Sequence, residues 1–374
     1  MVAALIRKAL SCFQLKLGFK RLIAICAGLG VFAMPACTSL PYYWQAAQGQ
    51  WQLQTSAKPV AQWLAAPSTP PALKTKLEAT QKMRAFASDA LDLPRNLSYT
   101  LYADLGRPAV LWNVFATPAL SLKLSESCFP IAGCVQYKGF FNQTDAIAYA
   151  KTLTSQGLDV QVAPVPAYST LGWFNDPLLN TFIHYPEEAL AKLIFHELAH
   201  QQLYVKDDSV FNESFATAVE ELGLERWQAA NPNPASSAAL LAWEARRADF
   251  KTLIARTHDD LKAAYALPDN AQQAAGKAAA LADLNLRYAA LKLSWGGFSG
   301  YDGWFKPPAD GLPAVGNAHF AALEAYQRWV PAFKRMAAQH ASFAQFYKAV
   351  GALAQKPKAE RERLLQNLTP QPPL

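Results

Sequence analysis

The most informative segment of the sequence is Pro186-Glu-Glu-Ala-Leu-Ala-Lys-Leu-Ile-Phe-His-Glu-Leu-Ala-His200. A proline followed by two acidic residues is typical of the first turn of a helix, where the missing N–H costs nothing and carboxylates face the positive end of the helix dipole. The apolar residues that follow recur at helical spacing. The stretch therefore predicts a helix on which His196 and His200, four residues apart, share one face.

This pair of histidines is typical of a zinc site. Two imidazoles on one helix face can bind one Zn²⁺ at about 2.0–2.1 Å, and the intervening Glu197 lies where it can act as general base toward a zinc-activated water. Because the whole chain contains 6 histidines, the spacing is a specific signal. A solvated helix face with satisfied histidines is the other interpretation of such a pair.

A catalytic zinc ion needs a third protein ligand as well as an open position for water. The segment Phe211-Asn-Glu-Ser-Phe-Ala216 offers Glu213 at the start of the next predicted helix. Since the connecting residues 206–209 are polar and loop-like, the two helices can fold back on each other and bring Glu213 to the metal. The downstream Asn-Glu-x-x-Ala pattern favours one zinc ion held by His196, His200 and Glu213 over the solvated helix face.

The rest of the chain predicts an α+β fold that is mostly helical. Between about 95 and 185, short runs rich in β-branched and aromatic residues predict a small β-sheet that precedes the histidine helix. From 186 to about 360 helical spacing dominates, and the proline-containing C-terminal tail is expected to be loose. The expected strands include 97–102, 110–115 and 160–162, and the other expected helices are 73–91, 143–156, 213–229, 236–264, 271–292, 319–328 and 341–355.

The composition favours a globular protein and excludes one class of partner. Of the 374 residues, 52% are hydrophobic and 17% are charged, which is enough apolar material for a sizeable core. The formal net charge is +7, but residues 1–36 contain five basic residues and no acidic one. The remaining charge is +7 − 5 = +2, so the charge does not support nucleic-acid binding.

The N-terminus is typical of a secretory signal. Basic residues as far as Arg21 precede an apolar stretch over 22–33, which has the length of a signal h-region. Ala36-Cys37 then follows, so we predict a lipoprotein signal peptide over 1–36, lipidation of Cys37 and a zinc peptidase domain over 37–374. Ordinary cleavage near Ala36 with a free Cys37 is the alternative. Thr38 after the cysteine, by resemblance to known lipoproteins, implies an exported protein anchored to the outer membrane and facing the periplasm.

Two further cysteines, Cys128 and Cys134, lie in the short segment Cys-Phe-Pro-Ile-Ala-Gly-Cys. A closely spaced pair in an exported protein predicts a local disulfide bond, because Pro130 and Gly133 allow a tight turn. Two free buried thiols are the other interpretation.

The HExxH motif with its downstream Asn-Glu-x-x-Ala resembles the gluzincin metallopeptidases. The similarity is closer to a bacterial lipoprotein family assigned as zinc aminopeptidases, and it spans nearly the whole chain. This resemblance implies a gluzincin-like zinc peptidase domain with a peptide substrate, zinc at His196, His200 and Glu213, and Glu197 as base. The stretches that carry the resemblance, besides the N-terminus, are 134–141, 168–177, 196–223 and 315–320.

The sequence departs from the large HExxH aminopeptidases in two ways. Only 12 residues separate His200 from Glu213, which is fewer than in those enzymes. No Gly-x-Met-Glu-Asn segment is present, although that segment supplies the carboxylate that grips the substrate amine there. We therefore expect this chain to share zinc binding and the general base with those enzymes more closely than their specificity for the N-terminal end of a peptide.

Several other residues are candidates for the site. Asp176 could meet a substrate amine, although an Asp before a proline is more often a turn residue. The surrounding segment 169–177 is a candidate edge strand for pairing with a substrate backbone. Glu220, seven residues after Glu213, could orient a histidine ligand or be a solvated helix charge. A donor to the oxyanion of the transition state is also expected, and its candidates, each of which could instead fill the core, are Tyr301, His319 and Tyr326.

Two functional interpretations follow. The first is a periplasm-facing zinc peptidase, either an aminopeptidase or a small endopeptidase. The alternative is a non-catalytic envelope lipoprotein with a structural zinc or a partner-binding role. Glu197, the lack of cysteine ligands and the lack of an evident fourth ligand argue against this alternative, because structural zinc sites usually fill four positions with Cys and His.

Overall fold

The computed structural model describes residues 40–129, 133–167, 169–232, 234–309 and 311–369. The predicted signal peptide and Cys37 lie outside the described residues. None of the helices in the described part combines the length and apolar character needed to cross a membrane. The fold is α+β and mostly helical, as predicted.

The histidine helix is α6 (Glu187–Gln202), and it begins after Pro186 as predicted. Its apolar face is completely buried, from Leu190 to Leu198, against α7 (Ser209–Ala230) and α4 (Pro71–Asp89). Burial of several large side chains stabilises such a helix far more than its intrinsic propensity does. This packing holds one edge of α6, the one with the histidines, toward the strands.

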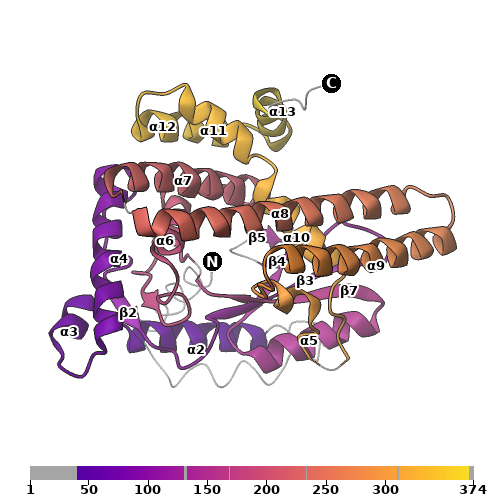
Figure 1. Cartoon of the computed structure of the whole chain (residues 1–374), viewed down its shortest axis with the longest axis horizontal. Helices are drawn as coiled ribbons and strands as arrows, with labels where there is room; N and C mark the ends of the chain where they lie inside the picture. The colour runs from indigo at the N-terminus through magenta and orange to yellow at the C-terminus, as the bar shows by residue number, and fades with distance from the viewer. Residues whose placement is uncertain (1–39, 130–132, 168, 233, 310, 370–374) are drawn as a thin grey trace, which may run out of the picture.

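The main sheet has three strands in the order β6-β3-β7, all antiparallel. The central strand β3 (Leu111–Pro118) pairs with β6 (Lys138–Phe140) and, along its whole length, with β7 (Leu158–Val165). Helix α5 (Gln143–Ser155), which matches the predicted helix, packs on β3 and β7, and Figure 1 places α2 (Leu40–Ser56) and α5 on the opposite side of the strands from α6 and α7.

Two smaller strand groups flank this sheet. In the first, β2 (Leu101–Ala103) lies between β1 (Lys58–Pro59) and β8 (Leu178–Leu179). In the second, β4 (Ser127–Phe129) and β5 (Gly133–Val135) form a hairpin closed by the predicted disulfide between Cys128 and Cys134, which is confirmed.

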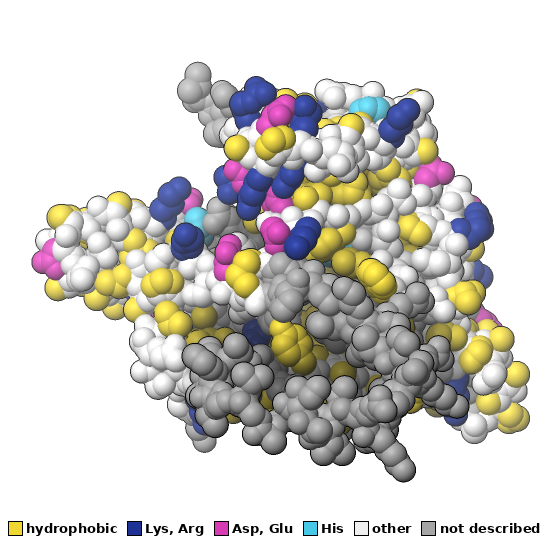
Figure 2. Space-filling model, turned by 180° about the vertical axis from the view of Figure 1, so that it is seen from behind, with side chains coloured by type: hydrophobic (Ala, Val, Ile, Leu, Met, Phe, Trp, Pro, Cys, Tyr) yellow, Lys and Arg dark blue, Asp and Glu magenta, His cyan; other side chains and the backbone are white. Residues whose placement is uncertain are grey.

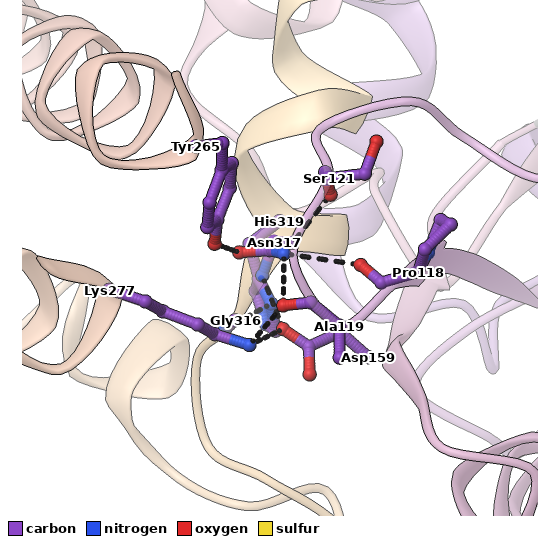
Figure 3. Close-up of polar contacts among 9 residues, drawn as sticks. All are labelled: Pro118, Ala119, Ser121, Asp159, Tyr265, Lys277, Gly316, Asn317 and His319. Carbon is purple, nitrogen blue, oxygen red and sulfur yellow. Dashed lines mark hydrogen bonds and ion pairs between the residues drawn. The ribbon is translucent and has the colours of Figure 1, made fainter. Parts of the chain in front are cut away.

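Helices α8 (Pro234–Tyr265) and α9 (Asn270–Ser294) form a long hairpin that extends beyond the rest of the molecule (Figure 1). Hydrophobic side chains are scattered over this hairpin (Figure 2), and four of its leucines are exposed. Near its turn the hairpin is tied to the sheet by the polar cluster of Figure 3. Asn317, the first residue of α10 (Asn317–Gln327), donates from its side chain to three backbone carbonyls at and just beyond the end of β3, and it accepts from Tyr265. Lys277 donates to Asp159 at 2.6 Å.

Two expectations about local structure are wrong. The described part of the C-terminal tail is not loose, because α13 (Lys358–Leu368) follows α11 (Val330–Ala338) and α12 (Phe343–Ala354), and the buried Arg361 of α13 forms an ion pair with Asp208 at 2.7 Å. The proline-containing end, residues 370–374, lies outside the described residues. The segment 169–177 is not an edge strand but a turn, because Leu171 and Gly172 have positive φ. The remaining short elements are α3 (Val60–Ala65) and the 3-10 turn Asp302–Phe305.

Candidate active site

His196, His200 and Glu213 come together at the junction of α6 and α7. The Nε2 atoms of the two histidines are 3.2 Å apart, and Oε2 of Glu213 lies 3.4 Å from that of His196 and 3.6 Å from that of His200. Ligand atoms at about 2.0–2.1 Å from one tetrahedral zinc are about 3.3 Å from each other. The three atoms therefore form a triangle of the size that such an ion requires, and these are the donor types that zinc accepts.

The loop between the two helices determines where Glu213 lies. Asn212 clamps this loop, because its side chain donates to the carbonyl of Val205 and accepts from the Val205 N–H, both at 2.7 Å. Asp208 caps α7 by accepting from the Phe211 N–H. Helix α7 thus begins four residues before the predicted start, and Glu213 lies just over one turn into it rather than at its first residue.

Glu220 lies two turns further along α7, on the same face. Its Oε2 is 2.9 Å from Nδ1 of His196, so the carboxylate can accept the Nδ1–H and leave Nε2 as the free ligand atom. Its other oxygen faces two cations, Lys192 at 3.6 Å and Arg247 at 4.0 Å. These cations compensate the charge of a carboxylate that is otherwise largely buried.

The electrostatics of the cluster reflect close contact between carboxylates and imidazoles. Burial would lower the pKa of His196, but Glu213 and Glu220 outweigh this effect and raise it well above its usual value. Burial would raise the pKa of Glu213, but His200 and His196 lower it to about 2. The site therefore concentrates negative charge on Glu213 and Glu220, and a divalent cation between the imidazoles and Glu213 would be favoured by the same attraction.

Glu197 lies where two cavities meet. The larger cavity, of about 880 Å³, and the smaller one, of about 310 Å³, both have His196 and Glu197 in their walls. Burial raises the pKa of Glu197, and His196 and His200 offset part of this rise. A carboxylate with a raised pKa beside an open cavity is suited to accept and return a proton.

Sequence reasoning missed Tyr137, which lies between β5 and β6 in the wall of the smaller cavity. Burial raises its pKa, and the nearby carboxylates of Glu213 and Glu197 raise it further, so the side chain stays neutral and keeps its proton. Tyr204 lines the same cavity. Tyr137 stands in one of the stretches that carry the family resemblance, but nothing local distinguishes it from an aromatic residue of the core.

Asp176 is buried away from both cavities. It is 3% exposed, and its oxygens accept from the Thr170 hydroxyl at 2.6 Å and from the Gln201 side chain at 2.9 Å. Burial raises its pKa to about 7, although the bonds from Thr170 and Gln201 act in the opposite direction. In this position the carboxylate joins the turn 169–177 to α6 through Gln201, and it is not among the residues that line either cavity.

The three candidates for the transition-state donor lie in different places. Tyr301 lines the larger cavity and stacks on Phe250, with ring centroids 4.0 Å apart. His319 lines neither cavity; its ring lies against Trp304, and its Nδ1 accepts from the Gly316 N–H. Tyr326 belongs to α10, and its side chain lies outside the described part of the structure.

Comparison with known proteins identifies one family. The model of a family described as "Putative aminopeptidase" matches residues 41–365, which include α6, α7 and both cavities. No match was found among curated proteins or among solved structures.

Proposed function

This chain belongs to the family described as putative aminopeptidases, and we propose that it is a zinc-dependent peptidase of the gluzincin type. The observation that carries the proposal is the triangle formed by His196, His200 and Glu213, with Glu197 beside it at the meeting point of two cavities. A peptide that crosses this point would have its scissile bond next to the metal and one flanking residue on each side.

His196, His200 and Glu213 would hold the zinc ion, and Glu220 would fix the orientation of the His196 ring. When bound, zinc polarises the scissile carbonyl and increases the acidity of water. Glu197 accepts a proton from the attacking water and returns it to the leaving amine. The raised pKa of Glu197 brings it closer to neutral pH, where a group can both accept and return a proton.

Tyr137 is the residue we propose as donor to the oxyanion. It lines the smaller cavity with Glu197 and Glu213, and its neutral hydroxyl can donate a hydrogen bond. A fixed donor of this kind stabilises the charge that develops on the carbonyl oxygen in the transition state.

The choice of aminopeptidase over endopeptidase rests on the family match. Among the described residues, the carboxylates that line the two cavities are Glu197, Glu213 and Glu220. Because each already has a role in metal binding or proton transfer, the linings do not themselves identify a further carboxylate for the amine of the substrate.

We further propose, from the sequence of the N-terminus, that the protein is exported and held by lipid on Cys37 at the outer membrane, facing the periplasm.

The test is to measure the metal content of the purified full-length chain and its action on a peptide mixture by mass spectrometry. We expect one zinc per chain, cleavage that stops when a chelator removes the zinc and returns when zinc is restored, and products shortened from the N-terminus. His200→Ala and Glu213→Gln should lose zinc. One tightly bound zinc without any cleavage would overturn the peptidase proposal and favour a binding protein, and internal cleavage would make the enzyme an endopeptidase.

A further inference from the structure

The larger cavity has a chemical character of its own. It lies between α6, α7 and α8, and it is closed by the loop 298–304 and by α10. Most of its lining is aromatic or aliphatic. The aromatic residues are Tyr185, Trp243, Phe250, Phe298, Tyr301, Trp304 and Phe320.

These aromatic rings pack on one another and form a preformed wall. Phe250 of α8 stacks on Tyr301 at 4.0 Å and meets Trp304 edge-on at 5.3 Å. Phe250 and Phe320 are buried, so both serve as the base on which the loop residues rest. A cavity of about 880 Å³ falls within the usual size of ligand sites and can take a large side chain together with the adjoining backbone.

The charged residues of the same cavity are mostly cations. Lys192, Arg247 and Lys251 line it, whereas its carboxylates are Glu197 and Glu220. One oxygen of the Glu220 carboxylate contacts Nδ1 of His196, and the other lies 3.6 Å from Nζ of Lys192. Burial lowers the pKa of both Lys192 and Lys251, and Arg247 lowers each further, while Glu220 and Glu221 act in the opposite direction on both. Outside the lining, Glu221 is paired with Lys334.

We propose that this cavity selects peptides whose residue at the scissile bond has a large apolar side chain, and that its cations exclude lysine and arginine there. The inference rests on the proposed function for the position of the scissile bond. An apolar side chain gains affinity by leaving water for this lining. A cationic side chain would have to leave water for a largely apolar wall, in a cavity where Lys192, Arg247 and Lys251 outnumber the carboxylates of Glu197 and Glu220.

The test uses hexa-alanine peptides in which one residue at a time is Phe, Leu, Gly or Lys. Cleavage by the zinc-loaded full-length chain gives kcat/KM for each peptide, and calorimetry with Glu197→Gln gives Kd without turnover. We expect Phe and Leu next to the scissile bond to exceed Gly by roughly 10- to 100-fold in both measurements. Lys at the same position should fall below Gly.

Two variants connect the selectivity to this cavity. Ala255→Trp fills it from α8, and should reduce the ratio of Phe to Gly peptides to within about threefold, whereas Ala245→Trp, at an exposed residue of α8 outside the lining, should leave it unchanged. Lys251→Glu should raise the relative rate for Lys peptides several-fold, and Lys262→Glu on the same helix should not.

The outcomes separate this inference from the proposed function. If the chain cleaves peptides but treats Phe and Gly alike, or if Ala255→Trp leaves the preference intact, the cavity does not select the side chain. If the chain cleaves nothing, yet Glu197→Gln binds Phe peptides selectively and Ala255→Trp abolishes that selectivity, the ligand class stands while the peptidase proposal fails.

Discussion

Protonation of His319 should destabilise the junction that ties the α8–α9 hairpin to the sheet (Figure 3). His319 is buried, and burial lowers its pKa to about 4, although the backbone of Gly316 and the nearby Asp159 act in the opposite direction. Its Nδ1 accepts the Gly316 N–H at 3.2 Å, and a protonated ring would lose this bond. Between this pKa and the higher, ordinary pKa of the unfolded chain, His319 is therefore neutral in the folded protein and protonated in the unfolded chain.

The size of the effect follows from linkage. The unfolded histidine titrates near its ordinary pKa of about 6.5, so the stabilisation is fully present above that value and is lost as the pH falls toward the folded pKa of about 4. Between pH 7 and pH 5 this one group should remove about 2 kcal/mol from the free energy of unfolding.

The assay is urea denaturation at pH 7 and pH 5 for the parent and for His319→Asn, whose side-chain oxygen can still accept the Gly316 N–H. Any constant cost of the substitution cancels in the difference between the two pH values. The parent should lose about 2 kcal/mol more than the variant. His184→Asn, at an exposed histidine, is the control for the substitution itself. Equal losses in the parent and in His319→Asn would show that protonation of His319 does not destabilise the folded state.

Three further predictions concern the site and its support. Glu220→Gln should weaken zinc binding roughly 10- to 100-fold in a chelator competition, because the carboxylate holds Nδ1 of His196 at 2.9 Å; an unchanged affinity would show that Glu220 does not orient this ligand. Tyr137→Phe should lower kcat by about 10²- to 10³-fold with zinc retained, as expected for loss of an oxyanion donor, and a normal kcat would exclude that role. Arg361→Met should cost about 3–5 kcal/mol in urea denaturation, because it leaves the buried Asp208 without its ion pair; a loss below about 1 kcal/mol would contradict the stabilising role of α13.

The juxtaposition of the three candidate metal ligands could be predicted because their pattern is local. His196 and His200 share a face by helical spacing alone, and Glu213 follows on the next helix after a short polar loop. Glu220 could be placed on the same face as Glu213 for the same reason. These inferences needed only the period of a helix and the chemistry of zinc ligands.

The surroundings of these candidate ligands could not be predicted, because they depend on contacts between distant segments. Tyr137 reaches the site through the pairing of β6 with β3, and the aromatic wall combines α8 with a loop some fifty residues later. Asp176 lies in a turn, as the following proline suggested, but its hydrogen bonds from Thr170 and from the distant Gln201 could not be read from that context. The order in α13 depends on Arg361 and Asp208, which are 153 residues apart.

The role of Glu197 as general base can be tested by measuring the peptide cleavage rate of Glu197→Gln beside that of the parent, with zinc content determined on the same samples. We expect both proteins to bind one zinc and the variant to be slower by about 10²- to 10⁴-fold, because it keeps the proposed ligands but loses the base. A variant that retains zinc and cleaves at the parent's rate would contradict the assignment of Glu197, and with it the proposed mechanism.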